Sequence, residues 1–381
     1  MMDGLLLRPP SFQTLARDFA ATAARHDREA SFPRQNFRAL HAAGLLGLTV
    51  PREHGGGGGG LARSAAVVGA IAEGCPATAL VLAMQLIQHH MIGREAGWAG
   101  LAARLGEGAA RRGELVNALR VEPELGTPAR GGLPATRLRR HGEGWVLSGR
   151  KIYATGAPGL HWMLVFAATE EDEPRTGLVL VPANARGVRI EESWDQAGLR
   201  ASGSHDVVFE GVALPPENAP DLRPSAAWGR PDASQAAWNT LLIAALYTGV
   251  ARAARNWLVE FLNARRPANL GAALATLPRM QEAVGRIEAR LLANDRLAAD
   301  AAAAEDRGEG LSAAQTGLIK TIAAENAIEV VQQAIALCGN HGLARGNPLE
   351  RHLRDVLCAR IHTPQPDAAH LAAGRLALGQ S

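Results

Sequence analysis

The chain has 381 residues, a formal net charge of +3 and 47% hydrophobic residues. This length supports two or three domains around a large core, and the small net charge without a long basic block argues against nucleic-acid binding. Three widely spaced cysteines argue against a disulfide framework and against a zinc site, and no metal site is expected. The N-terminus has no signal-peptide pattern and no apolar run reaches the roughly 18 residues of a membrane span, so we expect a cytoplasmic protein.

The first part of the chain has helical periodicity. Phe12, Leu15 and Phe19 recur at helical spacing, and similar patterns continue to about residue 115. Gly74 and Pro76 interrupt one of them, because proline lacks the N–H that a helix interior needs. We therefore expect an N-terminal α-helical domain over residues 1–115.

Six consecutive glycines, Gly55 to Gly60, follow the second predicted helix. A phosphate-binding loop is one interpretation of such a run. A dinucleotide fingerprint, however, needs a strand before it and a helix after it within a βαβ unit. Helical sequence precedes this run, so we favour a flexible surface loop, which the wide conformational range of glycine allows.

Short runs rich in Val, Ile, Leu and aromatic residues occupy residues 116–220. Gly and Pro punctuate them, and the sequence HGEG before Trp145 signals a turn. This pattern is typical of a middle antiparallel β-domain.

Helical periodicity returns over residues 221–381. Apolar residues lie on one face of three long segments, for example Leu242, Ile287 and Val331. With the terminal helices these segments predict a C-terminal four-helix bundle, so the fold class is α+β with three domains.

Five motifs occur in order along the chain: LHAAGLLGLTVPREHGG, VEPELGT, LSGRKIYATGAPGLHWMLVFA, AGLRASGSHDVVFEGVALPPEN and NPLERHLRD. Their order and spacing resemble the acyl-CoA dehydrogenase superfamily of flavoproteins, from about Phe12 to Gly379. The resemblance implies the three-domain fold, a flavin cofactor (FAD, with FMN as the alternative) and a homodimer or homotetramer.

The resemblance also implies cofactor-binding positions, which are Val121, Thr127, Tyr153, Thr155, Arg265, Gln281, Gly339 and Asn340. The first four match positions at the isoalloxazine ring, where Tyr153 covers the ring and the Thr155 hydroxyl reaches toward N5. Since Tyr and Thr favour strands in general, ordinary strand residues are the alternative. The last four match positions that reach the flavin of a neighbouring subunit.

The catalytic base of the family is missing. In the dehydrogenases a glutamate at one of two positions removes the α-proton of an acyl thioester, and these positions hold Thr363 and Asn239 here. Neither side chain can act as a base. Thr240 also stands where the family has an arginine that helps to hold CoA.

Histidines offer a different chemistry. Some branches of the superfamily are monooxygenases that use reduced flavin and oxygen, and they need hydrogen-bond donors near the flavin. Candidates are His89, His90, His205 and His362, with an ordinary surface or core histidine as the alternative for each. We take His362, Thr363 and His90 as the candidate catalytic residues.

Three functions remain open at this point. The first is a flavin-dependent oxidoreductase that oxidises an acyl-CoA or related small substrate by hydride transfer to flavin N5, without the usual glutamate. The second is a reduced-flavin-dependent monooxygenase on the same fold, and the third is a flavin-binding protein without dehydrogenase activity. An electron-transfer flavoprotein or a flavin reductase is the expected redox partner.

Overall fold

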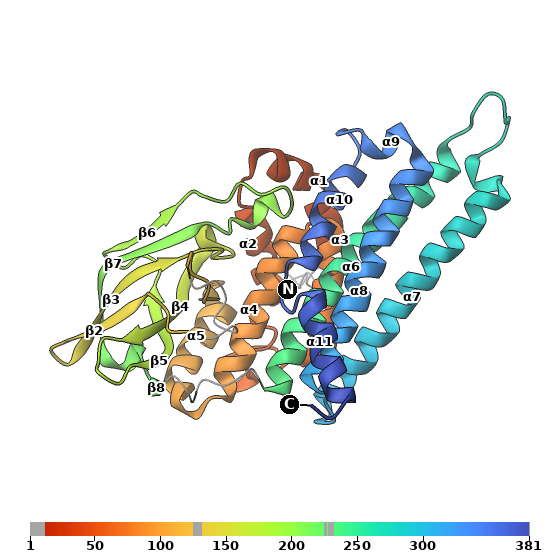
Figure 1. The fold of residues 1–381 in the computed structure, drawn as a ribbon. Helices are drawn as coiled ribbons and strands as arrows, with labels where there is room; N and C mark the ends of the chain where they lie inside the picture. The colour runs from red at the N-terminus through yellow and green to blue at the C-terminus, as the bar shows by residue number, and fades with distance from the viewer. Residues whose placement is uncertain (1–11, 125–131, 225–226, 228–231, 381) are drawn as a thin grey trace, which may run out of the picture.

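Helices, a sheet and a second set of helices follow one another in the computed structural model, which describes residues 12–124, 132–224, 227 and 232–380 (Figure 1). The first helices are α1 (Phe12–Glu29), α2 (Arg34–Ala42), α3 (Leu61–Gly74), α4 (Pro76–Arg94) and α5 (Ala99–Arg112). The strands are β1 (Leu115–Leu119), β2 (Arg137–His141), β3 (Gly144–Lys151), β4 (Leu160–Thr169), β5 (Arg175–Pro182), β6 (Val188–Glu191), β7 (Asp206–Leu214) and β8 (Arg223–Pro224). The last helices are α6 (Ala233–Ala264), α7 (Pro278–Asp306), α8 (Ala313–Cys338), α9 (Asn340–Leu343), α10 (Leu349–Leu357) and α11 (Pro366–Ala377).

The predicted break between the third and fourth helices is present. α3 ends at Gly74, and α4 begins at Pro76, where a missing N–H costs nothing because the first helical N–H groups have no intrahelical partner. Within the described ranges, no helix is long and apolar enough to cross a membrane.

The glycine run is more ordered than the sequence predicts. The N–H groups of Gly57, Gly58 and Gly59 donate to the carbonyls of residues 47, 50 and 48 at 2.7–2.9 Å. A Cβ on Gly56 would collide with the carbonyl of Val50, so the run allows two backbone segments to approach closely. The run lies at the surface as expected, but it is packed, and the chain itself occupies the N–H groups of Gly55 to Gly59, which leaves them unavailable to a phosphate.

The sheet is mainly antiparallel, in the order β6-β7-β3-β2-β4-β5-β8, with β1 added beside β4. The HGEG turn joins β2 to β3 as predicted. However, β1 and β2 both pair with β4 in parallel, which corrects the expectation of a wholly antiparallel sheet. Only tight hairpins force antiparallel pairing, and β1 and β2 reach β4 through longer connections.

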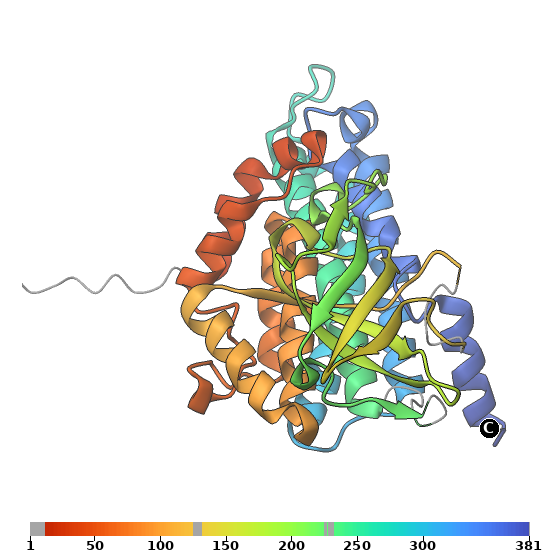
Figure 2. The same cartoon turned by 90° about the vertical axis from the view of Figure 1, so that its left-hand side faces the viewer.

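α6 lies at the centre of the molecule, packed against α3 and α4 on one side and α7, α8 and α10 on the other. Figure 1 shows the sheet at the left of these helices, and Figure 2 shows its strands in front of them. α5 and the short turn before it cover the sheet: Trp98 of the turn and Leu101 and Leu105 of α5 pack against Leu164 and Phe166 of β4.

Polar contacts tie the sheet to the helices next to α10. The backbone N–H of Leu199, before β7, donates to Asp355 Oδ1 at 2.7 Å. Arg354 binds both carboxylate oxygens of Asp27 in α1, at 2.9 and 2.6 Å, and donates to the Ala197 carbonyl at 2.8 Å. The segment from residue 197 to β7 is thereby fixed against both sets of helices.

Candidate active site

The segment after β3 is the first part of the candidate site. Tyr153 has a left-handed backbone, with φ of 57°, which turns the chain out of the strand. Its side chain is 55% exposed and meets Trp194 edge-on at a centroid distance of 6.2 Å. An exposed aromatic side chain held in this way offers a flat apolar surface to a ligand ring.

Val121 lies beside this segment. Its carbonyl accepts from the N–H of Ile152 at 3.0 Å. The next residue, Glu122, is buried and accepts from Lys151 Nζ at 2.6 Å and from Thr136 Oγ1 at 2.6 Å. Burial alone would raise the pKa of the Glu122 carboxyl, but these hydrogen bonds outweigh burial and lower it. The glutamate of VEPELGT is thus a structural anchor for Val121.

Thr155 is half-buried behind Tyr153. Its hydroxyl lies 3.1 Å from Ser204 Oγ, and its carbonyl accepts from Asn117 Nδ2 at 3.0 Å. Ser204 in turn lies 2.8 Å from Ser202 Oγ. This chain of hydroxyls joins the Tyr153 segment to the loop that contacts α10.

His362 lies in the turn between α10 and α11 and is half-buried. Its Nδ1 lies 2.8 Å from the hydroxyl of Tyr247, a fully buried residue of α6. Burial, and next the charge of Lys320, lower the pKa of His362 to about 4, so the imidazole is neutral at pH 7. Thr363 is exposed beside it.

His90 contacts α6 from another side. Its ring stacks on Trp238 with centroids 3.9 Å apart, and its buried Nε2 has no hydrogen-bond partner among the residues that the structure describes. Burial, with a smaller effect from Arg94, lowers the pKa of His90 to about 4. Trp238 and Tyr247 are about two and a half turns apart, so their side chains leave α6 on opposite sides. His90 and His362 therefore contact α6 on different sides of this helix and do not meet.

The candidate bases near these histidines are already engaged. The buried Asp355 accepts from the Leu199 N–H, and Glu325 forms an ion pair with Arg360 at 2.8 Å. In the part of the chain that the structure describes, no hydrogen bond joins a carboxylate to His362 or His90. Among the described residues, the hydrogen-bonding and ring contacts of the two histidines are therefore with Tyr247 and Trp238 and not with a carboxylate.

The other two histidine candidates have structural partners. His89 is buried and lies 3.0 Å from the amide of Gln85, and His205 Nδ1 accepts from the N–H of Trp194 at 3.1 Å. Both are better explained as core and loop residues than as site residues.

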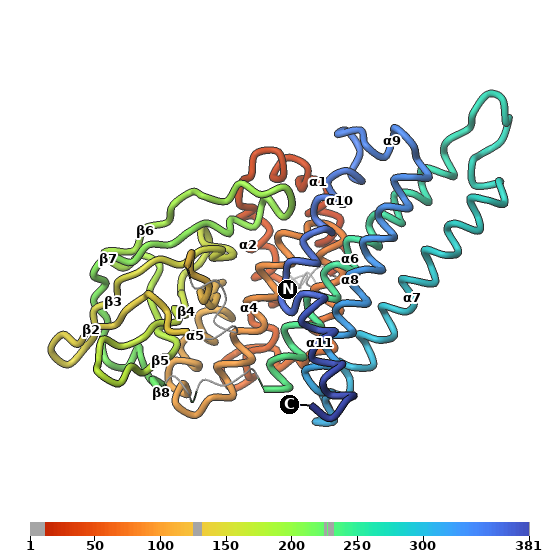
Figure 3. The backbone as a smooth tube through the Cα atoms, in the orientation of Figure 1, coloured from red at the N-terminus to blue at the C-terminus, as the bar shows by residue number. Residues whose placement is uncertain are grey.

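The four residues expected to reach a neighbouring subunit gather at one end of the bundle. The connection from α6 to α7, with the exposed Arg265 and Gln281 at its ends, lies at the same end as α9 (Figure 3). The rings of Phe261 and His341 are 5.2 Å apart, which brings the α9 region, including Gly339 and Asn340, next to the end of α6. Thr127 lies outside the described residues.

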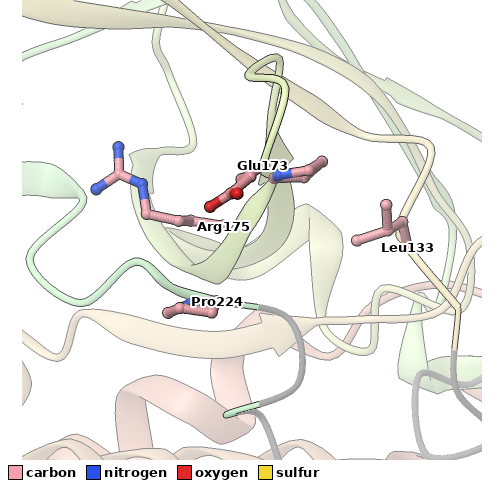
Figure 4. A pocket seen from close by; sticks show the side chains of 5 residues that line it. Leu133, Glu173, Arg175 and Pro224 are labelled. Atoms are coloured by element: carbon pink, nitrogen blue, oxygen red, sulfur yellow. The ribbon is translucent and has the colours of Figure 1, made fainter.

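Two cavities lie away from these residues. One, of about 500 Å³, is lined by Leu133, Glu173, Pro174, Arg175 and Pro224 at an edge of the sheet (Figure 4). The other, of about 680 Å³, lies between α1 and the start of α10 and includes Asp27, Arg200 and Arg351. Neither includes a predicted site residue.

Sequence reasoning missed Tyr247, Trp238 and Lys320, which contact the two candidate histidines or their backbone. The available signal was the phenol hydroxyl of Tyr247 in an otherwise apolar stretch of the chain. Its partner is far away along the chain, so no local pattern links the two.

Three family models match the chain in the order expected from the motifs. They are the N-terminal, middle and C-terminal domains of acyl-CoA dehydrogenase, which match residues 10–98, 120–212 and 241–365. The chain belongs to the acyl-CoA dehydrogenase family. This confirms the resemblance, the α+β class and the classification as a flavin-dependent oxidoreductase.

Relatives in this family cover nearly the whole chain. A putative acyl-CoA dehydrogenase, YdbM of Bacillus subtilis, is 32% identical over 358 residues, which is 93% of this chain and 92% of that protein. The structure of KijD3 in complex with FMN and a dTDP-linked amino-keto sugar has a TM-score of 0.84 and 27% identity, and covers 98% of this chain and 95% of that one. A nitrososynthase from Micromonospora carbonacea var. africana has a TM-score of 0.82 and 26% identity, with 96% and 94% covered.

Proposed function

We propose that this member of the acyl-CoA dehydrogenase family is a monooxygenase that uses reduced flavin and molecular oxygen on a small substrate. One observation carries the proposal: a neutral histidine, held by a buried tyrosine, stands beside Thr363 where the dehydrogenases need a carboxylate. Removal of an α-proton requires a base whose pKa is near the working pH, and an imidazole with a pKa of about 4 is a poor one.

The residues present fit a flavin. Tyr153 offers an exposed aromatic face, Thr155 a hydroxyl, and His90 a buried Nε2 that has no partner in the described chain. A bound flavin, FAD or FMN, would supply two electrons to oxygen, so that one oxygen atom enters the substrate and the other leaves as water. KijD3, a similar structure, is described with FMN.

Each candidate residue has a role in this proposal. Tyr153 covers the ring, Val121 contributes backbone groups at its edge, and the Thr155 hydroxyl hydrogen-bonds to it. Burial disfavours a charged imidazole, so the His362 ring is neutral and has one N–H. We assign this N–H the role of hydrogen-bond donor at the reacting side. His90 supplies a second polar group beside Trp238, and the exposed Thr363 contributes only its small size, which leaves space that a glutamate would fill.

The assembly and partners are part of the same proposal. The exposed Arg265, Gln281, Gly339 and Asn340 gather at one end of the bundle, where they would contact the flavin of a second subunit in a homodimer or homotetramer. A flavin reductase would supply the reduced flavin. Domain boundaries after residues 115 and 220 and a cytoplasmic location remain predictions.

The test is the reaction of the reduced, flavin-loaded protein with oxygen. We expect slow return of flavin absorbance near about 450 nm in the wild type. In His362→Ala the return should be roughly tenfold faster, with more hydrogen peroxide released, since one hydrogen bond is worth about 1.4 kcal/mol. His370→Ala, which changes an exposed histidine of α11, should match the wild type. Equal rates in His362→Ala and wild type would contradict the proposal.

Oxidation of an acyl thioester is the second candidate function, and the similarity to YdbM favours it. Anaerobic addition of acyl-CoAs of several chain lengths to the oxidised protein distinguishes the two. Loss of the flavin absorbance with any of them would favour the dehydrogenase, with a base supplied from elsewhere. Unchanged absorbance with all of them would exclude it for those substrates.

A further inference from the structure

Tyr247 and Lys320 hold His362 from two sides. The phenol oxygen of Tyr247 lies 2.8 Å from Nδ1 of His362, and the two rings are tilted by 39° with centroids 5.8 Å apart. Tyr247 has no exposed surface, whereas His362 is half-buried. Nδ1 is engaged by Tyr247, whereas Nε2 of His362 has no hydrogen-bond partner among the described residues.

The direction of the Tyr247–His362 hydrogen bond follows from burial. If the phenol oxygen only accepted, its own O–H would be left buried and unpaired, at a cost of about 1–3 kcal/mol. No other acceptor for this O–H occurs in the described part of the chain. Burial raises the pKa of the Tyr247 phenol well above its ordinary value, so the proton stays on oxygen. The O–H therefore donates to Nδ1, and a neutral imidazole must carry its proton on Nε2.

Lys320 fixes the backbone of the same turn. Its Nζ is fully buried and donates to the carbonyls of Ala359, His362 and Pro364 at 2.7, 2.7 and 3.0 Å. An ammonium group has three donors, and all three are used here. The turn between α10 and α11 is thus tied to α8 through its carbonyls and to α6 through the His362 ring.

We propose that Tyr247 is a positioning residue that holds His362 as the Nε2–H tautomer, and that Lys320 fixes the turn so that this N–H is available as a donor to a bound ligand. The tautomer is a property of the protein itself. What the N–H acts on rests on the proposed function.

The primary test observes the ring nitrogens directly, by long-range ¹H–¹⁵N correlation in the full-length chain labelled with ¹⁵N-histidine, with His362→Gln to assign the signals. We expect the wild type to show protonated Nε2 and bare Nδ1. Tyr247→Phe keeps the ring and removes only the hydroxyl, so the fixed tautomer should be lost and the pKa of His362 should rise. Tyr153→Phe, which removes the other tyrosine hydroxyl of the chain, should leave the His362 signals unchanged. Protonated Nδ1 in the wild type, or unchanged signals in Tyr247→Phe, would overturn the proposal.

A second pair of variants serves if Tyr247→Phe does not fold. The amide nitrogen of glutamine can take the place of Nε2, and that of asparagine the place of Nδ1. His362→Gln should therefore keep the slow return of flavin absorbance in oxygen, and His362→Asn should lose most of it. The reverse order would overturn the proposal. If the wild type shows protonated Nε2 while His362→Ala reacts with oxygen at the wild-type rate, the tautomer stands and the proposed function fails.

Discussion

At the scale of single residues, the ion pair of Lys151 and Glu122 shows how a motif residue can serve structure. Both side chains are almost completely buried, with exposed fractions of 0% and 2%, and their charged atoms are 2.6 Å apart. Burial lowers the pKa of Lys151 to about 8 despite its partner. The pair places the Val121 carbonyl beside the Tyr153 segment, so its contribution to the site is indirect.

Removing one partner should cost far more than removing both. Lys151→Met leaves Glu122 buried without its charged partner, and we expect a loss of about 3–5 kcal/mol in the free energy of unfolding, measured by urea denaturation. The double variant Lys151→Met/Glu122→Gln should recover a large part of this loss. Arg307→Met breaks an exposed ion pair with Glu309 and should cost about 0–1 kcal/mol. If Lys151→Met were as stable as the double variant, the two side chains would not be coupled in this way.

At the scale of elements, the end of one helix caps the start of another. Asp306, the last residue of α7, accepts from the N–H groups of Leu61 and Ala62, the first two residues of α3, at 2.6 and 3.0 Å. A carboxylate at this position satisfies two unpaired donors and favours the positive end of the helix dipole. A Cβ on Gly60 would collide with Asp306, which explains why the glycine run extends up to α3.

Asp306→Ala should therefore destabilise the junction of α3 and α7. We expect a loss of about 1–2 kcal/mol in the free energy of unfolding, comparable to the loss of a strong N-cap. Asp300→Ala, an exposed position of the same helix, is the control and should change stability by less than about 0.5 kcal/mol. Equal effects of the two substitutions would argue against the capping role.

At the scale of the whole molecule, buried neutral histidines make stability depend on pH. Burial lowers the pKa of His89 to about 4 and, together with the charge of Arg351, that of His352 to about 3, from an ordinary value of 6.5. Between the folded and unfolded pKa values the unfolded chain binds more protons, so stability is full above about pH 6.5 and falls as the pH drops. Asp355 has the opposite effect on stability, because burial raises its pKa to about 6 and the folded chain then holds its proton more tightly. The lowered pKa values of His90 and His362 add to the loss of stability at low pH.

Urea unfolding at pH 7, 6 and 5 should show a falling free energy of unfolding. Each buried histidine contributes at most about 1.4 kcal/mol per pH unit below its unfolded pKa. His89→Gln should reduce the slope by up to that amount, while His370→Gln, at an exposed position, should leave it unchanged. A free energy that is constant from pH 7 to pH 5 would contradict the proposed burial of neutral imidazoles.

The sequence by itself determined the fold, and with the family resemblance it predicts that the usual catalytic base is absent. Periodicity separated helices from strands, because helix and strand repeat their apolar faces at different spacings. The five motifs and their order identified the family, and the resemblance implies that Thr363 and Asn239 stand at its base positions. The parallel pairing of β1 and β2 with β4 was not predicted, because no local sequence pattern specifies how strands far apart in the chain pair.

Only the tertiary structure decided how the candidate site residues are held. Tyr247 and His362 are 115 positions apart, and Lys320 is 42 from the carbonyl it binds at His362. The glycine run likewise is explained by Asp306 and Val50, which no periodicity connects to it. Hydrogen bonds and burial depend on which segments meet in space. A periodic sequence pattern indicates only whether a segment forms a helix or a strand.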